Sequence, residues 1–193
     1  MKSGLTKKVS IAGPGTDFSD PIEAVQKAIN ELQGLGVNRT IALTHIGYDK
    51  DIELASKTRG LDLIIGGHSH TLIGDFPEAK GKYPTIQKDL DGQEVFIVTA
   101  YRWGEYLGRI NLAWDSTGKV AKYEGIPIRL DNTTTQDPQL KQEVEESRKL
   151  FDGLSKQGVG ESSVELVQST CQVEECTLGD VVRSISLRVG CSI

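Results

Sequence analysis

The first element that the sequence predicts is an amphipathic helix beginning at Asp20. From Ile22 to Leu32, apolar side chains recur every three or four residues, which places them on one face of a helix. Asp20 can cap this helix, and Pro21 suits its first turn. Gly34 marks its end. The pattern therefore predicts a helix that packs one face against a core.

Short uninterrupted apolar runs alternate with a second helical pattern after this helix. Residues 40–43 and 61–65 predict two short buried strands, and residues 49–57 between them predict a short helix. The order helix–strand–helix–strand is typical of parallel strands joined by crossover helices. The expected fold class is therefore α/β.

From residue 94 the pattern changes to strands separated by turn residues. Residues 94–99, 107–114 and 120–130 predict strands, with turn signals at Asp91-Gly92 and over residues 116–118. We expect these strands to form an antiparallel β-meander.

The last third of the chain predicts two helices and a connection between them. The first helix runs from Asp137 to about Phe151, and a linker rich in Gly, Ser and Lys follows over residues 152–163. Residues 164–167 predict a short strand, and residues 177–187 predict the second helix.

Composition and charge narrow the class of protein. Of the 193 residues, 37% are hydrophobic and 25% are charged, which suits a globular domain. The net charge of −5 argues against nucleic acid as a partner, because such proteins usually carry a basic face. No apolar run approaches the roughly 18 residues of a membrane helix, and the first residues lack the apolar run of a signal peptide. We therefore expect a soluble chain, with its location undetermined.

The three histidines, His45, His68 and His70, each follow a predicted strand. Ligands of open α/β sheets bind at the carboxyl ends of the strands, so these imidazoles are expected at one edge. In an extended Gly66–His70 segment, the two histidines would point to the same side. Neutral imidazole is a common ligand for Zn, Mn or Fe, so the pattern predicts a metal site. The alternative is three ordinary surface histidines.

Nearby carboxylates do not complete the site from sequence alone. Asp49 and Asp51 stand at the start of the second predicted helix, where capping explains them, and Asp62 marks a strand edge. We assign none of them as a ligand. The chain has no Gly-x-Ser-x-Gly elbow and no Walker loop, which argues against a nucleophilic triad and a P-loop.

Cysteines and sequons bear on the compartment. Cys171 and Cys176 are close enough in sequence to form a small disulfide loop, which would leave Cys191 over; three reduced thiols are the alternative. Asn38 and Asn132 begin N-glycosylation sequons, which matter only in a secreted protein.

Several of these segments together resemble a known family. The segments are Thr44-His45-Ile46-Gly47, Asp51-x-x-Leu54-Ala55 and Asp62-Leu63-Ile64-Ile65-Gly66-Gly67-His68-Ser69-His70-Thr71. They resemble the calcineurin-like metallophosphatases, and more closely their 5'-nucleotidase branch. Tyr83-Pro84-Thr85 and Gly104-x-x-Leu107-Gly108 extend the similarity, and Cys171-x-x-x-Glu175-Cys176-x-Leu178-Gly179-Asp180 resembles the start of that family's second domain.

The resemblance implies part of an α/β/β/α metallophosphatase sandwich. Residues 1–151 would be the C-terminal half of the metallophosphatase domain, residues 152–163 a linker, and residues 164–193 the start of the second domain. The family's remaining metal ligands and its catalytic His–Asp dyad would precede residue 1, and its base-stacking aromatics would follow residue 193. We therefore expect no catalytic residue in this chain. A half-domain would leave a sheet edge unpaired, so self-association is expected.

The resemblance also implies a site with two divalent cations, such as Zn or Mn. His45 and His68 resemble ligands of one cation, and His70 resembles a ligand of the other. The Cys171–Cys176 pair matches a disulfide of some extracellular members, which implies an extracellular or secretory parent protein.

In this family the cations activate a water molecule that attacks phosphorus, and the substrate is a nucleotide. A nucleoside monophosphate would give nucleoside and phosphate. Alternative substrates are nucleoside di- or triphosphates, cyclic nucleotides and UDP-sugars. Alternative functions are a non-catalytic truncated fragment and a secreted module that binds nucleotides.

Overall fold

The structure, a computed structural model, describes residues 16–158, 160–171 and 174–189. The chain divides into two compact units, the first ending at Thr134 and the second beginning at Thr135. This boundary lies before the helix that the sequence analysis places in its first domain. The assignment of residues 1–151, 152–163 and 164–193 to family domains stays a prediction.

The first unit begins with the predicted helix–strand–helix–strand order. Helix α2 (Pro21–Gly34) is capped by Asp20, whose carboxylate accepts the N–H groups of the two residues after Pro21 at 2.9 and 3.3 Å. Strand β1 (Ile41–Leu43), helix α3 (Tyr48–Lys57) and strand β2 (Leu63–Ile65) follow. Strands β1 and β2 pair in parallel, so the α/β prediction is confirmed.

The prediction of a three-stranded meander is wrong. Strand β4 (Glu94–Val98) pairs in parallel with β2 and antiparallel with β3 (Thr85–Lys88), a strand that the sequence analysis missed. Within the described residues, these strands form one sheet in the order β1-β2-β4-β3. Strands β5 (Tyr106–Trp114) and β6 (Val120–Arg129) form a separate antiparallel ribbon.

The burial of β4 explains why it sits inside the sheet. All four residues from Val95 to Val98 are buried, so both faces of the strand are covered, as in a central strand. The turn before it is closed by Asp89, whose carboxylate accepts the N–H groups of Asp91 and Gln93 at 2.8 and 2.9 Å. This turn directs β4 back along β3, and β2 pairs with the other edge of β4, so no edge remains for β5.

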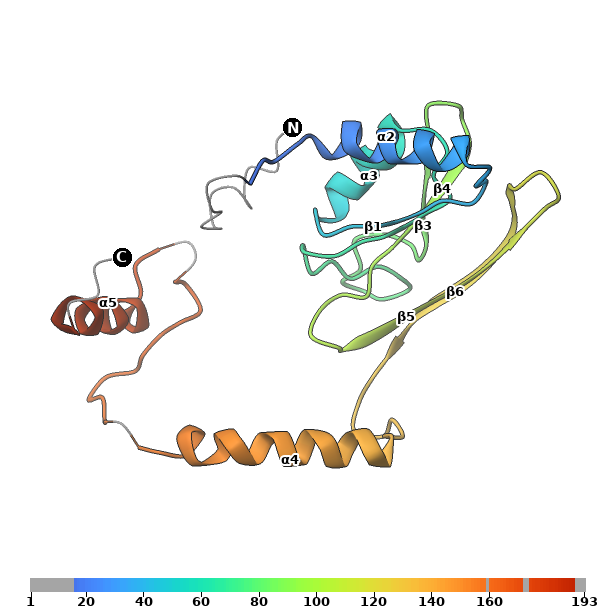
Figure 1. The fold of residues 1–193 in the computed structure, drawn as a ribbon. Coiled ribbons are helices and arrows are strands. Elements are labelled where there is room, and N and C mark those ends of the chain that lie inside the picture. The colour runs from blue at the N-terminus through green and yellow to red at the C-terminus, as the bar shows by residue number, and fades with distance from the viewer. Residues whose placement is uncertain (1–15, 159, 172–173, 190–193) are drawn as a thin grey trace. The chain divides into compact units, whose positions relative to one another are not determined.

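The core of this unit lies on both faces of the sheet. On one face, Ile29 of α2 and Leu54 of α3 pack with Ile64 of β2. On the other face, Phe96 of β4 lies under the β5–β6 ribbon, with its ring 4.9 Å from that of Tyr123. Figure 1 shows the two helices on one side of the sheet and the ribbon on the other.

Strand β1 is less buried than the sequence predicts. The strand predicted at residues 40–43 is present, but Ile41 is 53% exposed and Leu43 is 83% exposed, so the prediction that it is buried is wrong. The reason is its position: in the described part of the chain, β1 is one of the two edge strands of the sheet. An apolar edge of this kind is where another strand can add.

The second unit contains helix α4 (Pro138–Ser155) and helix α5 (Thr177–Val189). Both predicted helices are therefore present. The first extends past Phe151 into the predicted linker, and Asp137 caps it by accepting the N–H of Leu140 at 2.9 Å. Among the described residues, no helix is long and apolar enough to cross a lipid bilayer.

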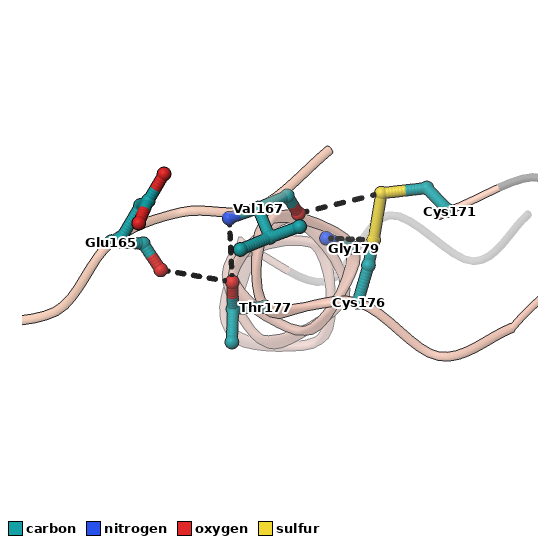
Figure 2. The surroundings of a disulfide bond; sticks show 6 residues. All are labelled: Glu165, Val167, Cys171, Cys176, Thr177 and Gly179. Carbon is teal, nitrogen blue, oxygen red and sulfur yellow. Dashed lines mark hydrogen bonds between the residues drawn. A yellow bond between two sulfur atoms is a disulfide. The ribbon is translucent and has the colours of Figure 1, made fainter. Parts of the chain in front are cut away.

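The segment before α5 is not the strand predicted over residues 164–167. It is instead held by the side chain of Thr177, the first residue of α5. The Thr177 hydroxyl accepts the N–H of Val167 at 2.8 Å and donates to the carbonyl of Glu165 at 3.0 Å (Figure 2). One threonine thus satisfies backbone groups that a neighbouring strand would otherwise pair.

A disulfide joins Cys171 and Cys176 directly before α5 (Figure 2). The Cys176 sulfur also accepts the N–H of Gly179 at 3.2 Å, in the first turn of the helix. Cys191 lies outside the described residues. The disulfide loop therefore helps to cap the first turn of α5.

Candidate metal centre

Three loops meet at the carboxyl edge of the parallel strands. Strands β1, β2 and β4 run in the same direction, so their ends lie side by side. The loop after β1 carries His45, and the loop after β2 carries His68 and His70. The loop after β4 carries Arg102 and Trp103. This is the edge at which open α/β sheets bind ligands.

His45 and His68 lie next to each other. Their ring centroids are 5.1 Å apart and the ring planes meet at 70°. Two imidazoles bound to one cation at about 2.1 Å with a tetrahedral angle would place their centroids about 5 Å apart. The pair therefore has the separation expected of two ligands of one cation.

Glycines allow the two histidine loops to approach closely. A Cβ atom on Gly67 would lie 3.0 Å from Nδ1 of His45, closer than ordinary side-chain packing. In the other direction, Gly47 lies against Ser69, where a Cβ would make an ordinary contact at 3.6 Å, but its φ of 95° favours glycine. Each loop thus presents a glycine to the other.

Ser69 fixes the second histidine loop to the start of α3. Gly47 precedes this helix and offers no side chain as a cap. The hydroxyl of Ser69 instead accepts the N–H of Tyr48, at 3.0 Å, and shares a hydrogen bond with Thr71 at 2.7 Å. A residue between two histidines therefore performs the capping that the first loop lacks.

The segment from His68 to His70 is not extended. His68 has a φ of 81° and His70 a φ of 48°, so the extended geometry that would point both rings to one side is wrong. The ring of His68 makes an edge-to-face contact with that of His45, whereas the ring of His70 makes one with that of Trp103, at 5.6 Å between centroids. The structure thus brings His45 and His68 together and places His70 in a separate contact.

Left-handed backbone gathers at this edge. Across the described residues, the non-glycine residues with positive φ are His68, His70, Tyr101 and Trp103. All of them follow β2 or β4. Such a conformation costs on the order of 1 kcal/mol or more per residue, and it is concentrated at functional sites.

Asp51 is a buried carboxylate behind the first histidine loop. It is only 1% exposed and accepts a hydrogen bond from the hydroxyl of Thr44 at 2.6 Å, so it does not cap the helix as predicted, although it lies in the first turn. Burial raises the pKa of Asp51 to about 6, against the lowering effects of Thr44 and His45. Gly66 lies against its second oxygen, where a Cβ atom would overlap the carboxylate.

The other two nearby carboxylates are occupied elsewhere. Asp49 forms an ion pair with Lys80 at 2.6 Å. Asp62 accepts the N–H of Thr40 at 2.7 Å, and burial raises its pKa. Within the described residues, no group of three or more His, Cys, Asp or Glu side chains is arranged to hold a metal ion. The described part of the chain thus offers two neighbouring imidazoles, and the assignment of all three histidines as ligands stays a prediction.

Sequence reasoning missed the contribution of Asp51 and of the loop after β4. A signal for that loop was present, since residues 101–103 follow a buried strand just as the histidines do. The two sequon asparagines, Asn38 and Asn132, are both exposed.

The chain is similar to several 5'-nucleotidases. No family model matches it. The snake venom 5'-nucleotidase of Naja atra is 38% identical over 184 residues, which cover 92% of this chain and 35% of that protein. The human 5'-nucleotidase is 37% identical over 190 residues, covering 93% of this chain and 33% of the relative. The chain thus spans about a third of the length of these relatives.

Solved structures agree with this similarity. The 5'-nucleotidase precursor of Thermus thermophilus has a TM-score of 0.81 and 33% identity, covering 96% of this chain and 39% of that one. The NAD nucleotidase of Haemophilus influenzae has a TM-score of 0.60 and 25% identity, covering 77% of this chain and 30% of that one. The fold is therefore that of the metallophosphatase class. Together with the sequence relatives, it shows that the chain is similar to 5'-nucleotidases over nearly its whole length.

Proposed function

We propose that this chain supplies part of the metal site of an enzyme that hydrolyses the phosphoester bond of nucleotides. The observation that carries the proposal is the proximity of His45 and His68 at neighbouring strand ends, with ring centroids 5.1 Å apart. The similarity to 5'-nucleotidases along 92% of the chain supports the same reaction class.

In the proposed site, His45 and His68 hold one divalent cation, such as Zn or Mn, and His70 contributes to a second. Such cations polarise a phosphoryl group and lower the pKa of bound water. The chain's own residues bring the ligands together: Gly67 admits the ring of His45, and Ser69 anchors the loop of His68. The proposed substrate is a nucleoside monophosphate, and the products are nucleoside and phosphate.

We propose further that the parent protein is extracellular. The Cys171–Cys176 disulfide, the exposed asparagines of two sequons and the relatives from snake venom support this location. Peptide mapping without reduction would detect the disulfide. Glycosidase-sensitive mass at Asn38 or Asn132, after expression through a secretory pathway, would detect glycosylation.

Metal binding by the chain tests the proposed site directly. We expect equilibrium dialysis against Zn²⁺ to show weak binding, and AMP hydrolysis to be slow, because two neighbouring imidazoles are half of a tetrahedral ligand set. The substitution His68→Ala should remove the binding.

His70→Ala is the matched control, because His70 is a histidine of the same loop that lies outside the converging pair. It should weaken binding less than His68→Ala does. Binding that is equal in the wild type and in His68→Ala would contradict the proposed site.

A further inference from the structure

The loop after β4 is a third element of the candidate centre. Its backbone is left-handed at Tyr101, Trp103 and Gly104, with φ values of 62°, 52° and 75°. This conformation projects the indole of Trp103 from the loop, and the residue is 77% exposed. A side chain this large normally finds a packing partner unless the surface is used.

Arg102 holds the indole in place. Its guanidinium carbon lies 4.2 Å from the centroid of the Trp103 ring and 4.7 Å from that of Tyr101. The Nε of Arg102 donates to Glu105 at 3.3 Å, which limits the guanidinium to this position. Tyr101 in turn packs edge-on against Tyr106 at 6.0 Å between centroids. The indole is thus braced although it is exposed to solvent.

The braced indole contacts a histidine of the neighbouring loop. The rings of Trp103 and His70 are 5.6 Å apart with their planes at 68°, an edge-to-face arrangement that aromatic pairs favour. His70 itself is exposed and has left-handed backbone, so this contact restricts an imidazole that solvent would leave free to rotate.

We propose that Trp103 is a positioning residue that sets the orientation of the His70 imidazole for binding a divalent cation. This inference rests on the proposed function, because it needs His70 to be a ligand. An imidazole that is already oriented loses less rotational freedom when it binds, so the indole increases the affinity of the site without touching the metal. Loss of the ring contact should weaken binding about two- to tenfold.

Tryptophan fluorescence provides a readout specific to this role. The chain has two tryptophans, so the substitution Trp114→Phe leaves Trp103 as the one tryptophan, which can be excited selectively over the tyrosines. Co²⁺ is a suitable probe, because it takes imidazole ligands and quenches nearby indoles. In this background we expect saturable quenching by Co²⁺, and His70→Ala should weaken it.

Two substitutions of Trp103 separate ring contact from bulk. Trp103→Phe keeps an aromatic ring beside His70 and should bind Co²⁺ within about twofold of the wild type in equilibrium dialysis. Trp103→Leu keeps apolar bulk without a ring and should show the full loss. Thermal unfolding of both variants establishes that they fold, since Trp103 is exposed and adds little to the core.

The outcomes distinguish this inference from the function on which it rests. Co²⁺ binding that requires His70 but is unchanged in a folded Trp103→Leu variant would overturn the inference alone. Trp103 emission that does not change at saturating Co²⁺ would do the same. A wild-type chain that binds no Co²⁺ up to millimolar concentration would overturn the proposed site and this role together.

Discussion

Replacing Asp51 by asparagine tests whether the ionised Asp51 carboxylate, buried behind the first histidine loop, lowers the free energy of unfolding. Asp51 is buried, accepts one hydrogen bond from Thr44 and has its pKa raised from 3.8 to about 6 by burial. A rise of this size corresponds to about 3 kcal/mol between the protonated and ionised forms. Asparagine has nearly the same shape, still accepts from Thr44 and cannot ionise.

The sign of the pH effect follows from the raised pKa. Between about pH 6 and pH 4, the folded protein holds a proton on Asp51 that the unfolded chain has released, so acidification favours the folded state. This contribution is complete below pH 4 and is lost as the pH rises through 6. Asp51→Asn should therefore be more stable than the wild type at pH 7.5, and the difference should shrink by about 3 kcal/mol by pH 4.

Urea unfolding at pH 4, 6 and 7.5, followed by circular dichroism, measures this difference. The comparison between variant and wild type is needed because other carboxylates titrate in the opposite sense. Hydrogen bonds from Lys50 and Lys57, for example, lower the pKa of Glu53 to about 2. Asp49→Asn is the matched control, since Asp49 lies in the same helix but is exposed and paired with Lys80. Equal pH dependence in wild type and Asp51→Asn would refute the reasoning.

Two further predictions concern a buried glycine and the exposed sheet edge. Gly66→Ala should destabilise the first unit by about 2–3 kcal/mol in urea unfolding, because its Cβ would overlap the Asp51 carboxylate. Gly34→Ala, with nothing within 4 Å of a new Cβ, should not destabilise it, and equal effects of the two substitutions would contradict this packing. We also expect the chain to self-associate through β1. Leu43→Lys should reduce the association seen by sedimentation, and Leu35→Lys, at a similarly exposed residue outside that strand, should leave it unchanged.

The local elements were predictable where their signals lie within a few residues. Asp20 and Pro21 define the start of α2, and the apolar periodicity defines its buried face. The histidines were correctly expected at strand ends, because parallel strands joined by helices present their carboxyl ends together.

The errors arose where a partner distant in sequence decides the structure. The turn at Asp91-Gly92 was recognised, but it joins β4 to β3, and no local pattern shows which strand β4 will choose. Residues 164–167 have strand-like composition, yet the hydroxyl of Thr177 satisfies their backbone. Asp51 resembles a helix-start carboxylate in sequence, and its burial depends on Thr44 and Gly66.

The hydrogen bond from the Tyr48 N–H to Ser69 has a consequence for how this edge behaves as a whole. The first turn of α3 is completed by an atom of the other histidine loop, so ordering that loop also orders the helix. A ligand that binds His68 would therefore slow the exchange of the Tyr48 amide with solvent, because both depend on the order of the same loop. Conversely, a substitution that frays the start of α3 would lower the affinity of the proposed site for a cation, although every imidazole is retained.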